Sequence, residues 1–251
     1  MMHDKGFALI TGACGGIGRE MVRVFYEEGY RVIATDKAEP PEDLPYEHFL
    51  QPDLERTVLD EDHAGRVFDS IRGMLGRAGL KVLINNAAVQ ILGATDSLSR
   101  EDWQATLNVN LLAPFIWSQA LLPELEQAAG SIINLSSIHA KLTKRGFLAY
   151  ATSKAALSGM TRAMAVDVGD RVRVNAIEPA AIATNMLKSG FKDREDLFQK
   201  LEQYHPTLRI GRPHEVARLA LALCDGSLGF LHGACITLDG GIGSRLFDPD
   251  D

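Results

Sequence analysis

A tyrosine and a lysine stand four residues apart in the stretch AYATSKAAL, at Tyr150 and Lys154. On a helix, this spacing places both side chains on one face. An ammonium group within a few ångström favours the phenolate and lowers the pKa of a tyrosine, which is about 10 in water. The pair therefore suits proton exchange near neutral pH, although an ordinary amphipathic helix can also carry a Tyr and a Lys at this spacing.

A glycine-rich stretch, ALITGACGGIGRE (8–20), offers a second chemical feature. Glycines let a backbone turn sharply and approach a ligand, and the amides at the start of a following helix attract phosphate. The spacing G-x-x-x-G-x-G differs from the common dinucleotide pattern G-x-G-x-x-G, and the Gly-Lys-Ser/Thr ending of a P-loop is missing. We interpret the stretch as a pyrophosphate cradle, the alternative being a tight turn without a ligand.

Asp36 ends the apolar segment RVIAT, eighteen residues beyond Gly18. A carboxylate at this point can accept hydrogen bonds from both ribose hydroxyls of an adenosine, and it repels a 2′-phosphate. The sequence therefore favours NAD over NADP. Lys37 beside the acid can partly neutralise it, and a surface acid at a strand end is the alternative interpretation.

The segments that must position these residues alternate between two patterns. Short apolar runs typical of buried strands occupy 7–11, 31–35, 81–85, 131–135, 171–177 and 234–238. Apolar residues recur at helical spacing over 18–29, 63–79, 99–130 and 149–169. Because parallel strands need crossover connections, the alternation predicts an α/β fold, a doubly wound Rossmann-type parallel sheet with helices on both faces.

The chain is expected to form one domain over residues 1–251, since no linker composition or internal repeat divides it. The stretch 184–212 interrupts the alternation of strands and helices before the last helix. We predict that this stretch is a helical lid over a substrate site.

Composition excludes several classes of function. The chain is 46% hydrophobic and 24% charged, as expected for a globular protein, and its formal net charge of −7 argues against a nucleic-acid partner. The three cysteines are scattered, without neighbouring ligands at metal spacing, so neither a metal site nor a disulfide framework is expected. No signal peptide or membrane-spanning stretch stands out, which predicts a cytoplasmic protein with no membrane partner.

In order along the chain, these motifs resemble the short-chain dehydrogenase/reductase family, over nearly the whole length. The resemblance rests on Thr11-Gly12-Ala13-Cys14-Gly15-Gly16-Ile17-Gly18, on Asn85-Asn86-Ala87-Ala88 and on Tyr150-Ala151-Thr152-Ser153-Lys154. Two positions depart from the family pattern, since Ala88 and Ala180 stand where glycine is usual. The acid-base residues are unaffected by these departures.

The resemblance implies four catalytic residues: Asn110, Ser137, Tyr150 and Lys154. Ser137 lies at the family spacing of thirteen residues before Tyr150 and is preferred to Ser136, while Asn110 is preferred to Asn108. Tyr150 would exchange the proton, Lys154 would lower its pKa and hold the nicotinamide ribose, Ser137 would bond the reacting oxygen, and Asn110 would position a water.

The resemblance also implies a cofactor site in which Asp53 meets the adenine and Thr184 the nicotinamide carboxamide. The full set of implied cofactor-binding residues is Thr11, Gly12, Gly16, Ile17, Gly18, Asp36, Asp53, Leu54, Asn86, Ala87, Tyr150, Lys154, Ile182 and Thr184. Helices around Asn110 and Tyr150 form the usual subunit interface of the family, which implies a homodimer or homotetramer.

Basic side chains between Ser137 and Tyr150 suggest a hydroxylated, anionic substrate such as a sugar acid, bound by His139, Lys144 and Arg145. Solvated loop charges are the alternative. Lys141 lies in the same stretch, and Glu178 either binds sugar hydroxyls or faces solvent.

Three functions remain open. The first is an NAD-dependent oxidoreductase that transfers hydride between nicotinamide and a secondary alcohol or ketone, such as a sugar, sugar acid or other polyhydroxylated molecule. The second is a 3-ketoacyl-acyl-carrier-protein reductase, although its usual basic residues for NADPH are missing from the glycine loop. The third is a non-catalytic NAD-binding sensor on the same fold.

Overall fold

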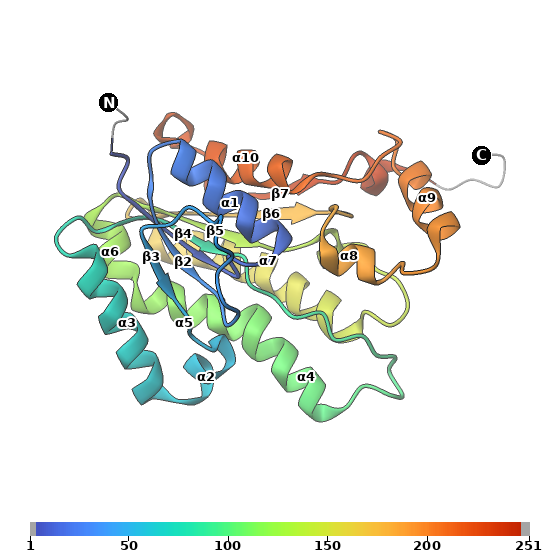
Figure 1. Cartoon of the computed structure of the whole chain (residues 1–251), viewed down its shortest axis with the longest axis horizontal. Helices are drawn as coiled ribbons and strands as arrows, with labels where there is room; N and C mark the ends of the chain where they lie inside the picture. The colour runs from blue at the N-terminus through green and yellow to red at the C-terminus, as the bar shows by residue number, and fades with distance from the viewer. Residues whose placement is uncertain (1–3, 247–251) are drawn as a thin grey trace.

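Seven short segments become the strands of one parallel sheet in the computed structural model, which describes residues 4–246 (Figure 1). Most of their side chains are buried, which suits a sheet that is covered on both faces. The strands are β1 (Phe7–Thr11), β2 (Arg31–Thr35), β3 (His48–Leu50), β4 (Leu80–Asn85), β5 (Ser131–Leu135), β6 (Arg173–Pro179) and β7 (Cys235–Leu238).

The strand order across the sheet is β3-β2-β1-β4-β5-β6-β7, and every neighbouring pair is parallel. The chain therefore builds outward from β1 in one direction and then returns to build outward from β4 in the other. The carboxyl ends of β1 and β4 meet where the direction reverses, which is the place where open α/β sheets bind ligands. The predicted doubly wound α/β class is confirmed, in a single domain.

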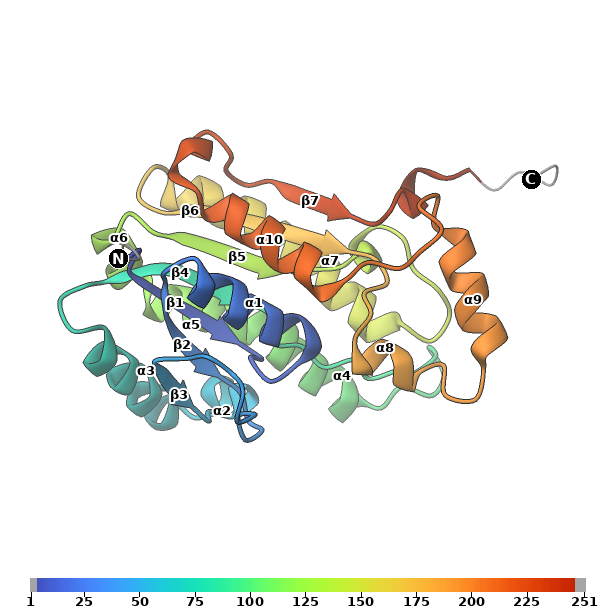
Figure 2. The ribbon, with the colours of Figure 1, turned by 45° about the horizontal axis from the view of Figure 1, so that its top comes forward.

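Helices cover both faces of the sheet (Figure 2). On one face, α1 (Gly16–Glu27) and α10 (Pro213–Cys224) pack against side chains such as Ile10, Val32 and Ile133. On the other face, α3 (Glu61–Leu75), α5 (Ala113–Ala120) and α7 (Leu148–Val168) bury Phe7, Leu83 and Val174. Alternate residues of each strand thus serve two separate cores.

Shorter helical segments connect these elements. They are α2 (Leu54–Leu59), α4 (Arg100–Leu107), the π-helical turn η1 (Asn108–Leu112), α6 (Leu122–Gln127), α8 (Asn185–Ser189) and α9 (Glu195–Tyr204), with 3-10 turns η2 (Ile138–Ala140), η3 (Gly226–Leu228) and η4 (Ile242–Ser244). Both α8 and α9 belong to the stretch 184–212.

Two expectations from the sequence are corrected. The helical pattern over 99–130 is not one helix, because the π-helical turn separates α4 from α5 and the chain breaks again between α5 and α6 at Leu121. Strand β3 is an additional edge strand, which is only three half-buried residues long and gives no clear apolar run. In residues 4–246, no helix is long and apolar enough to cross a membrane.

Candidate active site

Tyr150 and Lys154 lie in the first turns of α7, and Ser137 is the second residue after β5. Ser137 and Lys154 are almost fully buried, with 6% and 3% of their surfaces exposed. The hydroxyl of Ser137 caps the η2 turn by accepting a bond of 3.2 Å from the amide of His139. It also interacts with the phenol of Tyr150. The structure therefore brings together the three residues predicted for proton transfer.

Burial dominates the electrostatics of this group. It raises the pKa of Tyr150, and the interaction with Ser137 opposes that rise. Burial also lowers the pKa of Lys154 to about 7. The Lys154 ammonium lies 5.7 Å from the centre of the Tyr150 ring, and it donates to the backbone carbonyl of Leu135 at 2.7 Å. The expected lowering of the Tyr150 pKa is therefore not what the structure gives, because desolvation of the phenolate is the largest effect on this group.

Asn110 lies in the middle of the π-helical turn, a type of irregularity that often marks functional sites. Its side chain accepts from the amide of Val89 at 2.8 Å and donates to the carbonyl of Val89 at 2.9 Å. It also donates to the hydroxyl of Ser153, the neighbour of Lys154, at 3.1 Å. Asn108 instead donates to Glu55, at 3.1 Å, on the α2 side of the helix. Asn110 is thus the asparagine connected to the Tyr150 helix.

The glycine loop forms a tightly packed turn between β1 and α1. A Cβ atom on Gly18 would lie 2.0 Å from the carbonyl oxygen of Gly12, and one on Gly16 would lie 2.9 Å from the Thr184 methyl group. Gly12 has a φ of +67°, which favours glycine. Gly15 has no side chain to cap the start of α1, so no side chain at this position accepts from the first amides of the helix. This arrangement fits a phosphate group.

The end of β4 is joined to the glycine loop by side-chain bonds. The hydroxyl of Thr11 accepts from the amides of Asn86 and Ala87, at 3.0 and 3.1 Å. The side-chain amide of Asn86 donates to the carbonyls of Thr11 and Gly12, at 2.8 and 3.1 Å. Ile17 packs against the core beneath the loop. These contacts fix the two strand ends that border the predicted cofactor site.

Asp36 lies against the glycine loop, although it is twenty-two residues beyond Cys14 in the sequence. One carboxylate oxygen accepts from the Cys14 amide at 2.9 Å, and the other accepts from the Ala38 amide at 2.9 Å. Burial, and then the charge of Asp36, raise the pKa of the Cys14 thiol to about 11. A fixed carboxylate beside the cradle fits the ribose of a dinucleotide.

The remaining predicted cofactor residues border the same region. Asp53 caps α2 by accepting from the amides of Glu55 and Arg56, and Leu54 is the first residue of that helix. Thr184 caps α8, and its methyl group lies next to Gly16 of the glycine loop. Ile182 is buried and pairs with Gly211 in an isolated parallel bridge. The two ends of the predicted lid therefore lie side by side.

The predicted substrate cations are only partly available to a ligand. His139 stacks on Phe147, with ring centres 4.4 Å apart, and its edge meets Tyr150 at 5.7 Å. Burial, and then the charge of Lys144, lower the pKa of His139 to about 4. Lys144 lies 4.7 Å from the centre of the Phe147 ring, while Arg145 is exposed. His139 thus forms a neutral wall beside Tyr150.

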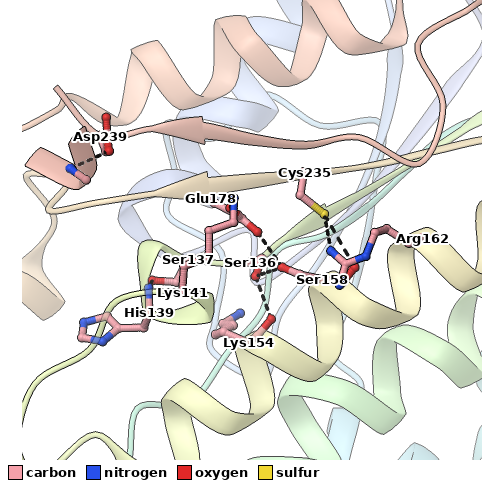
Figure 3. Close-up of polar contacts among 11 residues, drawn as sticks. Ser136, Ser137, His139, Lys141, Lys154, Ser158, Arg162, Glu178, Cys235 and Asp239 are labelled. Atoms are coloured by element: carbon pink, nitrogen blue, oxygen red, sulfur yellow. Dashed lines mark hydrogen bonds and ion pairs between the residues drawn. The ribbon is translucent and has the colours of Figure 1, made fainter. Parts of the chain in front are cut away.

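Glu178 is the site residue whose environment sequence reasoning missed. The expectation that it faces solvent is wrong, because it is fully buried and pairs with Lys141 at 2.7 Å (Figure 3). The alternative, that it binds sugar hydroxyls, stays a prediction. An acid near the end of a strand was the available signal, but its burial depends on neighbours distant in sequence. Within residues 4–246 no cluster of three or more His, Cys, Asp or Glu side chains can hold a metal ion.

The profile of a family described as "Enoyl-(Acyl carrier protein) reductase" matches residues 12–243. The chain belongs to the short-chain dehydrogenase/reductase family. It is 35% identical to the 3-oxoacyl-(acyl-carrier-protein) reductase of Thermotoga maritima, over 96% of this chain and 99% of that protein. It is 32% identical to the D-threitol dehydrogenase of Mycolicibacterium smegmatis, over 95% and 93%.

Solved structures of this family share the fold. The aldohexose dehydrogenase of Thermoplasma acidophilum, in ligand-free form, has a TM-score of 0.90 and 30% identity, covering 99% of this chain and 98% of that one. A 4-hydroxyisoleucine dehydrogenase complexed with NADH and the protein ElxO with NADP bound each have a TM-score of 0.85 and 26% identity. They cover 96% and 97% of this chain and all of their own chains. The chain is therefore an oxidoreductase of a family that binds nicotinamide cofactors.

Proposed function

We propose that the protein is an NAD-dependent dehydrogenase that interconverts a secondary alcohol and a ketone on a polyhydroxylated small molecule. The observation that carries this proposal is the convergence of Ser137, Tyr150 and Lys154 beside the glycine cradle. Asn110 joins them through Ser153, next to Lys154. Such a group can bind a reacting oxygen, move its proton and hold a nucleotide.

The proposed reaction assigns one task to each side chain. The phenolate of Tyr150 takes the hydroxyl proton of the alcohol, and the hydroxyl of Ser137 donates to the reacting oxygen. A bound NAD would supply the hydride acceptor for the alcohol carbon, and NADH would supply the hydride donor in the reverse direction. The charge of Lys154 stabilises the phenolate, and Asn110 orients a water that carries the proton away.

The choice of NAD rests on Asp36. Its carboxylate is fixed by the amides of Cys14 and Ala38 at the edge of the cradle, so a 2′-phosphate would meet a negative charge that cannot easily withdraw. The relatives include complexes with NADH and with NADP, and they leave both cofactors possible for the family. We therefore expect much faster turnover with NAD than with NADP.

The substrate class rests on the relatives and on the site wall. D-threitol and an aldohexose are the substrates named for two relatives, which supports a polyol or sugar. The neutral His139 ring beside Tyr150 can bond a hydroxyl. The anionic alternative is less supported, because Lys141 is paired with Glu178 and Lys144 lies over Phe147.

The second candidate function is a 3-ketoacyl-acyl-carrier-protein reductase, and the similarity to the reductase of Thermotoga maritima supports it. The third, a non-catalytic sensor, is disfavoured by the assembled proton-transfer group. We keep a substrate lid over 184–212 in the proposal. The bridge between Ile182 and Gly211 holds the two ends of this stretch together, so α8 and α9 would move as one lid hinged at the bridge.

The deciding experiment measures NADH formation from NAD with neutral polyols, aldoses, sugar acids, hydroxy acids and 3-hydroxyacyl thioesters, with Tyr150→Phe as control. We expect turnover of a polyol or aldose, reduced by about 10²-fold or more in the variant. Preference for NADPH with ketoacyl thioesters would select the second candidate. Cofactor binding without turnover in either direction would select the sensor.

We also propose that the chain forms a homotetramer or homodimer. Apolar side chains on α5 and α7 are exposed, with Phe115 at 41% and Leu148 at 38%. Surfaces of this kind favour association. Sedimentation analysis of the wild type and of Phe115→Lys tests this, and a monomeric wild type at micromolar concentration would contradict it.

A further inference from the structure

A continuous chain of side-chain contacts runs from Glu178 into the active site (Figure 3). The hydroxyl of Ser158 donates to Glu178 Oε1 at 2.8 Å. The hydroxyl of Ser136 lies 2.8 Å from that of Ser158 and donates to the backbone carbonyl of Lys154 at 2.9 Å. Ser136 directly precedes Ser137 in the chain. Each hydroxyl has one proton to donate, so with these two bonds made the Ser136 and Ser158 oxygens are in contact without a hydrogen bond between them. The two serines thus lie between the proton-transfer group and one buried carboxylate.

The other oxygen of this carboxylate, Oε2, forms an ion pair with the ammonium of Lys141 at 2.7 Å, and it accepts no hydrogen bond from the described residues. The side chain of Glu178 is 1% exposed, whereas that of Lys141 is 57% exposed. The pair joins β6 to the turn that begins with Ser137. A buried carboxylate requires a compensating charge, and Lys141 supplies it.

We infer that Glu178 and Lys141 form a positioning pair, which holds Ser137 and Lys154 in register and cancels the charge that either partner would otherwise place beside Tyr150. This inference rests on the proposed role of Tyr150. Neither partner touches the reacting atoms, because Glu178 is buried behind Ser136 and Ser158. The pair therefore acts through its charges and its bonds to the residues on either side of it.

Other charged or titratable groups around Glu178 are engaged elsewhere. On α7, Lys154 donates to Leu135 and Arg162 donates to the Cys235 sulfur at 3.6 Å. Cys235 itself donates to the carbonyl of Ser158 at 3.6 Å. Beyond β7, the carboxylate of Asp239 accepts from the amides of Gly241 and Gly243. On the η2 side, His139 is neutral near pH 7 and bonds Thr143.

The pair predicts opposite effects for its two single variants. Lys141→Met leaves an uncompensated carboxylate that disfavours the Tyr150 phenolate. The acidic limb of the kcat/KM profile for alcohol oxidation, where activity rises as Tyr150 loses its proton, therefore moves to higher pH. Glu178→Gln leaves a cation, which favours the phenolate, so the limb moves to lower pH. The second shift is smaller because Lys141 reaches solvent. The double variant removes both charges, and its limb lies near that of the wild type.

The experiment records these pH profiles for the wild type, both single variants and the double variant. We expect Lys141→Met to move the limb upward by about half a pH unit or more, a size consistent with one charge several ångström away. Lys141→Arg keeps the charge and is expected to keep the wild-type limb, so this comparison holds even if no Glu178 variant folds. Arg77→Met, a cation removed far from the site, serves as the control for net charge.

An unshifted limb in Lys141→Met would overturn the inference, as would a double variant shifted as far as Lys141→Met. Urea denaturation gives a readout that needs no turnover. Lys141→Met is expected to lose stability relative to the wild type, and Glu178→Gln in the same chain is expected to restore part of it. Coupling in denaturation together with absence of turnover would reject the proposed function and keep the pairing, whereas turnover without coupling or limb shifts would reject the pairing alone.

Discussion

The ammonium of Lys154 donates to the backbone carbonyl of Leu135, 2.7 Å away, in a site where burial lowers the lysine pKa to about 7. The pKa of a lysine in an unfolded chain is about 10.4. Between these two values the unfolded chain binds more protons than the folded chain, so the free energy of unfolding rises with pH. The cost of burying the charged form is fully present below pH 7.

Lys154→Met removes this dependence. Relative to the wild type, its free energy of unfolding is expected to be highest below about pH 7 and to fall as the pH rises toward about 10. Urea denaturation of both proteins at several pH values across this window measures the difference, with the exposed Lys200→Met as the matched control. Parallel stability curves for the wild type and Lys154→Met would contradict the lowered pKa.

The packing of the glycine loop gives a second prediction. Gly18→Ala places a Cβ 2.0 Å from the Gly12 carbonyl oxygen, and the backbone must shift to relieve this contact. We expect a loss of about 1–3 kcal/mol in the free energy of unfolding and a much weaker affinity for NAD. Gly73→Ala in α3 is the control, because nothing lies within 4 Å of its Cβ. The control is expected to gain about 0.5–1 kcal/mol. Equal stability of the two variants would show that the loop is not tightly packed.

Asp36 gives a prediction about cofactor choice. Asp36→Ala removes the carboxylate that faces the predicted ribose, so the KM for NAD is expected to rise by about tenfold while turnover with NADP increases. Glu42→Ala removes an exposed acid of the following loop and is expected to leave both KM values unchanged. The measurement is a pair of initial-rate series with the two cofactors. An unchanged NAD to NADP ratio in Asp36→Ala would assign the choice to other residues.

The two asparagines of the π-helical turn give a fourth prediction. Asn110→Ala leaves the Val89 amide and carbonyl without their partner, so both stability and kcat are expected to fall, stability by about 1–3 kcal/mol. Asn108→Ala loses bonds to Gln104 and Glu55 and is expected to lose stability while it keeps most of kcat. Steady-state kinetics beside denaturation separates the two. A comparable loss of kcat in both variants would remove the distinction.

Sequence patterns predicted most of the framework, for reasons that the structure makes clear. Six apolar runs became strands because a sheet that is buried on both faces needs continuous apolar sequence. The Tyr150 and Lys154 spacing and the glycine loop are local features, so both were visible. Strand β3 was not predicted, because three half-buried edge residues leave no periodic signal.

The environment of the buried polar groups could not be predicted from the sequence. Glu178 and Lys141 are thirty-seven residues apart, and only the folded sheet brings them together. The direction of the Tyr150 pKa shift depends on the same fact, since burial is a property of all the surrounding elements. The spacing of four residues predicted that Lys154 lies near Tyr150, but it did not predict that both side chains are removed from water.

The π-helical turn at Asn108–Leu112 has a consequence for how this region tolerates change in length. Such a turn holds more residues per revolution than an α-helix, and it orients Asn110 toward Val89 and Ser153. Deleting one residue here would let α4 and α5 merge into an uninterrupted α-helix and would remove the turn that orients Asn110 toward Val89 and Ser153. Natural insertions and deletions should therefore avoid the π-helical turn, which makes chain length near Asn110 a marker of a working site in related sequences.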